Sequence, residues 1–209
     1  MSQSSTRSAQ LAAIRYFAWP AICLAIAVPV IIAATSPLLA WREPVYIIAG
    51  FAGVLALALL LIQPLLVAGK LPGFLGLKGR RAHRWLGGAL LATIIIHIAG
   101  LWITSPPDVV DALLFRSPTP FSLWGVIAMW AVLIAALMAA LRRRLALPAH
   151  AWRRLHTALA LVVVITSVIH VLQIDGTMGT NSKILLCALA IIATFGAIIQ
   201  LRSWTMVKR

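Results

Sequence analysis

Long apolar runs separated by short polar segments dominate the chain. A helix that crosses the hydrocarbon core of a bilayer needs about 20 predominantly apolar residues. The runs that meet this need number six: Phe17–Ala34, Val45–Val67, Arg84–Thr104, Phe121–Leu141, Trp152–Gln173 and Ile184–Leu201. A transmembrane barrel would instead alternate apolar and polar residues, and this chain does not. The pattern predicts an all-α integral membrane bundle of six transmembrane helices.

Turn-forming residues occupy the segments between the runs. They form the sequences Ser36-Pro37, Leu71-Pro72-Gly73, Ser105-Pro106-Pro107, Ser117-Pro118-Thr119-Pro120 and Asp175-Gly176. Pro20, Pro29 and Pro64 lie inside runs, where neighbouring helices can satisfy the carbonyls that a proline leaves free. We therefore expect one transmembrane domain over residues 17–201, with an N-terminal segment at 1–16 and a tail at 202–209.

The charged side chains are distributed unequally between the two predicted membrane faces. Of 18 lysines and arginines, 15 fall on the face that holds both termini and the connections after the second and fourth runs. The other face holds Arg42, Arg116, Lys183 and all four acids: Glu43, Asp108, Asp111 and Asp175. The positive-inside rule then predicts that both termini are cytoplasmic. Topology thus accounts for the net charge of +14 without a nucleic-acid partner, although the basic loops can also attract anionic membrane lipid.

Four of the five histidines form an internal repeat. His83 ends the sequence RRAH and His156 ends RRLH, and a second histidine follows fourteen residues later in each case, at His97 and His170. Fourteen residues turn a helix by about 1400°, which is ~40° short of four full turns, and span about 21 Å. Both histidines of one helix therefore face the same way at two different depths.

The repeat predicts two pairs of facing imidazoles. Because the two helices run in the same direction, His83 lies at the depth of His156, and His97 lies at the depth of His170. Two imidazoles on separate helices can hold the iron of haem b between them. Two such haems would give electrons a route through the bilayer. A zinc site is disfavoured because no cysteine or carboxylate joins these positions; copper binding and proton relay remain alternatives.

Other residues near the histidines have two interpretations each. Five arginines lie at the depth of the inner pair and could bind haem propionates: Arg80, Arg81, Arg84, Arg153 and Arg154. On the outer side, Arg116 and Lys183 could do the same. Membrane topology also explains all of these charges. Gly87, Gly88 and Gly100 could admit a porphyrin or serve helix packing. Thr93 and Thr166 could bond the outer histidines or their own backbone. We interpret His150 as a residue of the basic loop.

Six spans with histidine pairs at this spacing on the third and fifth resemble the ferric reductase-like transmembrane domain family. That family includes the membrane parts of ferric reductases and NADPH oxidases, and a free-standing form in the haem-binding subunit of the bacterial methionine sulfoxide reductase system. The resemblance extends from about Phe17 to Leu201. It implies that His83, His97, His156 and His170 ligate two b haems. The chain carries no GxGxxG fingerprint or P-loop, so it cannot itself take hydride from a nicotinamide.

These features together predict an oxidoreductase component of a bacterial inner membrane. We expect electrons to come from a cytoplasmic flavoprotein, a bound flavin (FMN or FAD) or a membrane quinol. They would leave to a periplasmic or extracellular acceptor such as ferric iron, oxygen or a partner protein. One alternative is a quinol-oxidising cytochrome like the b561 group. The other is a histidine-dependent proton or metal transporter, for which inverted repeats would be expected.

Overall fold

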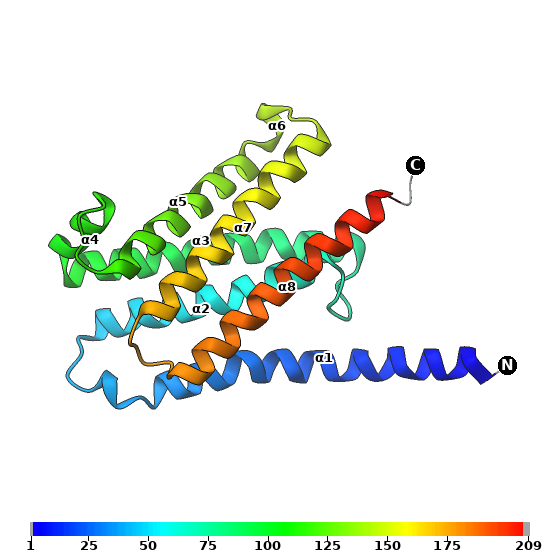
Figure 1. Ribbon diagram of the computed structural model, residues 1–209, viewed down its shortest axis with the longest axis horizontal. Coiled ribbons are helices and arrows are strands. Elements are labelled where there is room, and N and C mark those ends of the chain that lie inside the picture. Colours follow the sequence, from blue (N-terminus) through cyan, green and yellow to red (C-terminus); the bar gives the residue numbers. More distant parts are fainter. Residues whose placement is uncertain (1, 207–209) are drawn as a thin grey trace.

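The computed structural model describes the backbone of residues 2–206 and the side chains of residues 17–201. Within this part of the chain it is helical, with no strand. The elements are α1 (Ser2–Ala34), the 3-10 helix η1 (Pro37–Leu39), α2 (Pro44–Val67), α3 (Gly76–Thr104), α4 (Pro106–Leu113), α5 (Pro120–Ala140), α6 (Arg142–Leu145), α7 (Ala149–Gln173) and α8 (Thr180–Met206). The long helices form one bundle, with both termini at the same end (Figure 1).

Six of the described helices are long and apolar enough to cross a membrane, which confirms the predicted fold class. Their membrane-spanning parts are Phe17–Ala34, Pro44–Val67, Gly76–Thr104, Pro120–Ala140, Ala149–Gln173 and Thr180–Leu201. The largest difference from the predicted spans is at α3, where the span begins at Gly76 rather than Arg84. Hydropathy marks only the hydrocarbon core, whereas a helix can continue through the headgroup region where lysine and arginine are favourable. The protein is therefore a multi-pass integral membrane protein.

The predicted terminal segments continue the first and last helices. The backbone of residues 1–16 is helical from Ser2 and joins the first span without a break. At the other end, residues 202–209 continue α8 as far as Met206, and residues 207–209 lie outside the described residues. The division of the chain at residues 16 and 202 stays a prediction.

Short helices occupy two connections that the sequence marked only as turns, and a third, α6, lies in the basic connection after α5. Pro37 begins η1 and Pro106 begins α4, and the hydroxyl of Ser36 accepts a hydrogen bond from the Leu38 N–H. Proline suits the first position of a helix because its missing N–H is not needed there. A serine-proline pair therefore starts a helix as readily as it ends one, and α4 follows α3 directly through Ser105.

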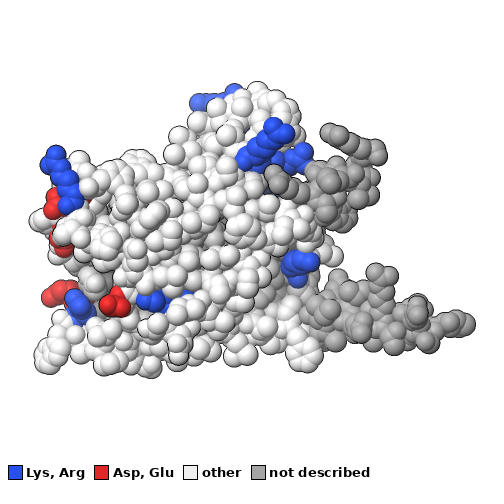
Figure 2. Space-filling model, in the orientation of Figure 1, with Lys and Arg blue, Asp and Glu red and all other residues white. Residues whose placement is uncertain are grey.

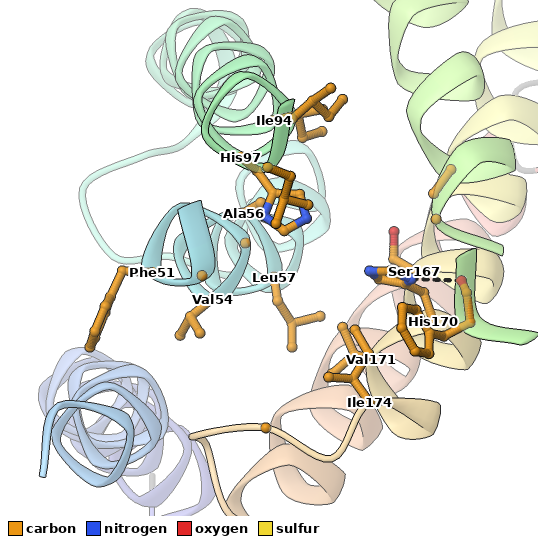
Figure 3. Close-up of a pocket in the computed structure, with 18 of the residues that line it drawn as sticks. Phe51, Val54, Ala56, Leu57, Ile94, His97, Ser167, His170, Val171 and Ile174 are labelled. Carbon is orange, nitrogen blue, oxygen red and sulfur yellow. Dashed lines mark hydrogen bonds between the residues drawn. The ribbon is translucent and has the colours of Figure 1, made fainter. Parts of the chain in front are cut away.

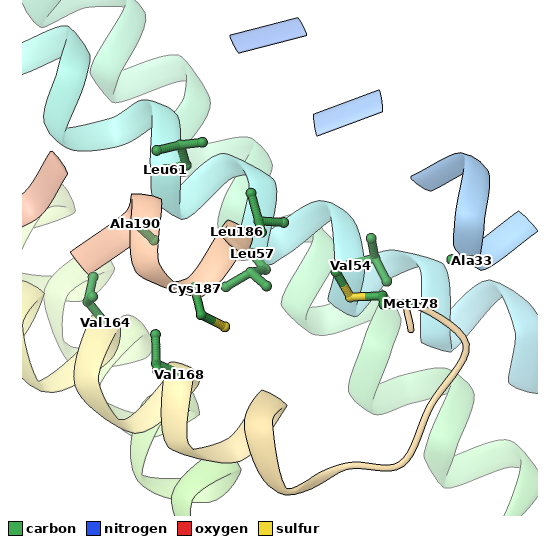
Figure 4. Close-up of a cluster of buried hydrophobic side chains, with 10 residues drawn as sticks. All are labelled: Ala33, Val54, Leu57, Leu61, Val164, Val168, Met178, Leu186, Cys187 and Ala190. Atoms are coloured by element: carbon green, nitrogen blue, oxygen red, sulfur yellow. The ribbon is translucent and has the colours of Figure 1, made fainter. Parts of the chain in front are cut away.

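The core is built from two tightly packed helix pairs, α2 with α3 and α5 with α7, and α8 packs against both α2 and α7. A buried cluster that includes Leu57, Val164 and Leu186 joins α2, α7 and α8 (Figure 4). In the α2/α3 pair, a Cβ at Gly100 would lie 2.7 Å from the Cβ of Ala49. Helix packing therefore requires the glycine at position 100. The two histidine-bearing helices, α3 and α7, belong to different pairs.

The charged side chains separate as the sequence suggested. Figure 2 shows the carboxylates gathered at one end of the bundle, while many of the described lysines and arginines lie at the opposite end. The acidic end carries the connections that follow α1, α3 and α7. Which end faces the cytoplasm stays a prediction of the positive-inside rule.

Candidate cofactor site between two helix pairs

A cavity of about 380 Å³ lies between the α2/α3 pair and the α5/α7 pair. Its volume falls within the range of about 300–1,000 Å³ that is usual for cofactor and small-molecule sites. Its walls are mostly apolar and include Leu60, Leu90 and Val163, which belong to a second buried cluster. His97 of α3 and His170 of α7 line it from separate helices (Figure 3). The structure thus brings the predicted outer pair to one cavity.

His97 is fixed by the backbone of the neighbouring helix α2. Its Nδ1 lies 2.7 Å from the carbonyl oxygen of Ala49. A carbonyl can only accept, so Nδ1 carries the hydrogen and donates, which leaves the lone pair of the neutral ring on Nε2. One turn further along α2, a Cβ at Gly53 would lie 3.2 Å from the same Nδ1. The glycine makes room for the imidazole to reach the carbonyl.

His170 is held in the same way by α5. Its Nδ1 donates to the carbonyl oxygen of Phe121 over 2.8 Å, and the Phe121 ring meets the imidazole edge to face at 5.9 Å. A Cβ at Gly125, one turn after Phe121, would lie 2.7 Å from Nδ1 and 2.8 Å from Cε1. In Figure 3 the second ring nitrogen of His170 points away from this carbonyl into the cavity. The arrangement of carbonyl, glycine and histidine therefore occurs twice.

The two outer imidazoles present unprotonated Nε2 atoms to an apolar cavity, which is the arrangement of metal-ligating histidines. Such histidines characteristically donate their other ring N–H to a carbonyl or carboxylate, which fixes the tautomer. Among the described residues, no cluster of three or more histidine, cysteine, aspartate or glutamate side chains could hold a metal ion alone. A pair of histidines suits a metal whose remaining ligands come from a prosthetic group, as in haem.

The inner pair is also brought together, in a different setting. The ring centroids of His83 and His156 are 6.0 Å apart, with the planes at 82°. His83 Nδ1 lies 3.3 Å from the carbonyl oxygen of Gln63. In contrast, the Nδ1 of His156 is buried without a hydrogen-bond partner, and so is the Oε1 of Gln63. One member of this pair is therefore positioned by something other than a backbone carbonyl.

A stack of side chains positions His156. The Trp152 indole lies nearly parallel to the imidazole, at 5.5 Å between centroids and 8° between planes. The guanidinium of Arg142 lies over the Trp152 indole, 4.4 Å from its centroid. The same arginine donates to the carbonyl oxygen of Leu147 over 2.9 Å, which ties it to the connection between α5 and α7.

The other predicted residues divide into those the structure places at the cavity and those it does not. Lys183 lines it, whereas Arg116 is exposed and is not among its lining residues. Thr93 and Thr166 donate to carbonyls of their own helices, at Leu90 and Val162, so neither bonds an outer histidine. The remaining predicted side chains are exposed: Arg81, Arg84 and Arg154 beside the inner pair, and His150 at the start of α7. That these three arginines bind the propionates of a haem stays a prediction.

Several site residues were not identified from the sequence. They are Ala49, Gly53, Gln63, Phe121, Gly125, Arg142 and Trp152. A glycine follows the residue whose carbonyl accepts the histidine N–H by four positions in both α2 and α5. This signal has meaning only once the helix that packs there is known. The partners of the histidines lie 48 and 49 residues away in sequence.

Comparison with protein families gives a match over much of the chain. The family described as "Ferric reductase like transmembrane component" matches residues 49–167, which is more than half of the chain. The matched segment begins at Ala49 and includes His83, His97 and His156, and it ends three residues before His170. No curated protein and no solved structure gives a significant match.

Proposed function

Because the chain belongs to the family of ferric reductase-like transmembrane components, we propose that it is an electron-transfer subunit that binds two b haems. Haem supplies one-electron redox chemistry when it is bound. The site at His97 and His170 carries this proposal. Two imidazoles with fixed tautomers approach one apolar cavity from separate helices.

The residues present fit a haem on observations independent of the family match. Gly53 and Gly125 leave the space that each imidazole occupies, and any larger residue would displace the rings. The carbonyls of Ala49 and Phe121 hold the ring N–H groups and so keep the Nε2 lone pairs available. Leu60, Leu90 and Val163 give the cavity an apolar wall against which a porphyrin could pack. These residues would bind and orient a haem in an apolar environment.

The two pairs provide cofactor positions at two depths of the same helices. His83 and His97 are fourteen residues apart on α3, as are His156 and His170 on α7, which corresponds to about 21 Å along each helix. A cofactor at the outer pair would therefore lie between the inner pair and the acidic end, on the path of an electron that enters at the basic end. An inside-negative membrane potential favours this direction by about 2.3 kcal/mol per 100 mV.

The donor and the acceptor are separate molecules in this proposal. Domains of this family generally work with a separate electron donor. A cytoplasmic flavoprotein, a bound FMN or FAD, or a membrane quinol would deliver electrons at the inner pair. Direct quinol oxidation would make the protein functionally similar to the b561 group. The acceptor would lie on the periplasmic side of a bacterial inner membrane.

Electron transfer across the bilayer can be measured in proteoliposomes. The haem-loaded protein is reconstituted into vesicles that contain ferricyanide, dithionite is added outside, and bleaching of the trapped ferricyanide is followed. We expect the wild-type protein to bleach it at least about tenfold faster than the His97→Ala/His170→Ala variant, because loss of one position breaks the route. Equal rates for the two proteins would contradict the proposal and favour the histidine-dependent transporter.

Trp152 provides a test specific to the inner pair. We expect Trp152→Leu to weaken haem retention at His83 and His156, because an aromatic stack is worth about 0.5–1.5 kcal/mol, or up to roughly tenfold in affinity. Trp152→Phe keeps a ring beside His156 and should retain most of the affinity. Haem loss from each variant is measured by transfer to apomyoglobin. Equal retention by the leucine variant and the wild-type protein would show that the stack in the structure has no positioning role.

A further inference from the structure

A buried lysine lies in the wall of the cavity. Lys183, in the first turn of α8, is 8% exposed and lines the cavity that contains His97 and His170. Its Nζ donates to the carbonyl oxygens of Ile174 at 2.7 Å and Leu172 at 3.4 Å, where α7 ends. An ammonium group has three hydrogens to donate, so these two bonds leave one unused. No carboxylate of the described residues forms an ion pair with it.

The position of Lys183 is electrostatically unfavourable without an anion. Removal of an ammonium group from water is unfavourable unless an opposite charge compensates. The residue also lies at the amino end of α8, where the helix dipole places a partial positive charge. The carbonyls at the end of α7 compensate only in part, because they carry partial charges. An ionisable side chain within a membrane span is by default a functional residue whose partner must be sought.

The charges around the cavity indicate where an anionic partner of Lys183 would bind. The charged residues that line the cavity are Arg42, Asp175 and Lys183, and all three lie in or beside the connections that follow α1 and α7, at the acidic end of the bundle. The guanidinium of Arg42 lies 5.1 Å from the centroid of the Tyr46 ring, which places it at the start of α2. Away from these charges the cavity is lined by apolar side chains such as Leu60, Leu90 and Val163. Two cations and one carboxylate leave a net positive charge at one end of an apolar cavity.

We propose that Lys183, together with Arg42, forms a carboxylate-binding site at the outer end of this cavity. One ammonium and one guanidinium can each pair with a carboxylate group, and the guanidinium can bond both oxygens of one of them. Two sources supply this chemistry. One is the propionates of the haem at His97 and His170, which rests on the proposed function. The other is a small carboxylate that binds at the mouth of the cavity.

A purely structural role of Lys183 makes different predictions from the proposed carboxylate site. If Lys183 only caps the last carbonyls of α7, glutamine should replace it, because its amide also donates hydrogen bonds. If Lys183 binds a carboxylate, glutamine should fail and arginine should succeed, because the charge is required. Arg116 provides the matched control, since it is an exposed cation at the same end of the bundle that does not line the cavity.

The first arm of the test measures the midpoint potentials of the haems by redox titration in a buffer free of carboxylates. With propionates as the source, Lys183→Gln should lower one midpoint and leave the other unchanged, because loss of a nearby cation disfavours the added electron. Lys183→Arg should restore the wild-type value, and Arg116→Gln should not change it. Arg42→Gln should give a smaller shift in the same direction. Because Arg42 is exposed, this variant serves as the test if Lys183→Gln does not fold.

The second arm measures citrate binding to the purified protein by isothermal titration calorimetry. With a free carboxylate as the source, Lys183→Gln should weaken citrate binding at least about tenfold and leave both midpoints unchanged. If the variants alter neither property, or if Arg116→Gln alters them equally, the carboxylate site is wrong. A wild-type protein without haem would contradict the proposed function instead. The citrate arm would then still decide the role of Lys183.

Discussion

Replacement of His170 by alanine is expected to reduce the haem content of the purified protein from about two to about one per chain. The variant lacks one of the two Nε2 atoms at the outer cavity, while the inner pair on α3 and α7 keeps both of its imidazoles. The fold should survive because His170 makes one polar contact, with the carbonyl oxygen of Phe121. That carbonyl keeps its hydrogen bond within α5. Haem is counted by the pyridine haemochrome method against protein concentration.

His97→Ala should give the same result, because His97 supplies the facing imidazole from α3. The matched control is His150→Ala, since His150 is exposed at the start of α7 and does not line the cavity. Its haem content should equal that of the wild-type protein. Loss of all haem from a folded His97 or His170 variant would contradict two separable sites.

Gly125→Ala is expected to remove the outer haem although it leaves every histidine in place. The added Cβ would lie 2.7 Å from His170 Nδ1 and 2.8 Å from Cε1, so the ring must move and its hydrogen bond to Phe121 must break. The fold itself should not suffer, because alanine is better than glycine in a helix interior by about 0.8–1.0 kcal/mol. The expected result is about one haem per chain with an unchanged or higher melting temperature.

The glycines of this chain offer graded controls for that prediction. At Gly53 the added Cβ would lie 3.2 Å from His97 Nδ1, so Gly53→Ala should weaken the outer haem less than Gly125→Ala does. At Gly196 the new Cβ would meet no side chain or neighbouring helix within 4 Å, and Gly196→Ala should leave haem binding unchanged. If Gly125→Ala binds both haems with wild-type affinity, the contact between α5 and His170 does not shape the site.

The spans and the pairing of the histidines could be predicted because both follow from local rules. Span length follows from the thickness of the hydrocarbon core, so six apolar runs were enough to predict six helices. The spacing of fourteen residues between His83 and His97 sets their common face through helix geometry alone. The pairing with α7 followed from the repeat of that spacing at His156 and His170, and the structure brings both pairs together.

The environment of the histidines could not be predicted because it depends on which helices pack together. The carbonyls of Ala49 and Phe121 belong to α2 and α5, and no local pattern links either residue to its histidine. The same reason explains why Gly53 and Gly125 were missed while Gly100, noted in the sequence, proved to be a packing contact with Ala49. Side-chain partners are properties of the assembled bundle.

The surroundings of individual charged residues could not be predicted from the sequence either. The positive-inside rule assigned Lys183 to the outer face from its place in the chain. That rule treats every cation alike, so it could not separate the buried Lys183 from the exposed Arg116. Likewise, Arg142 was counted only as one member of a basic loop, whereas the structure places it on the Trp152 ring beside His156.

The central claim is that this bundle holds haem between two histidine pairs, and the visible spectrum of the purified protein tests it most directly. The protein is produced with ample haem supply, its spectrum is recorded oxidised and then reduced, and haem is counted per chain. We predict about two b haems per chain with low-spin, six-coordinate spectra in both states. A folded protein that contains no haem would contradict the claim, and the four histidines would then belong to a proton or metal transporter.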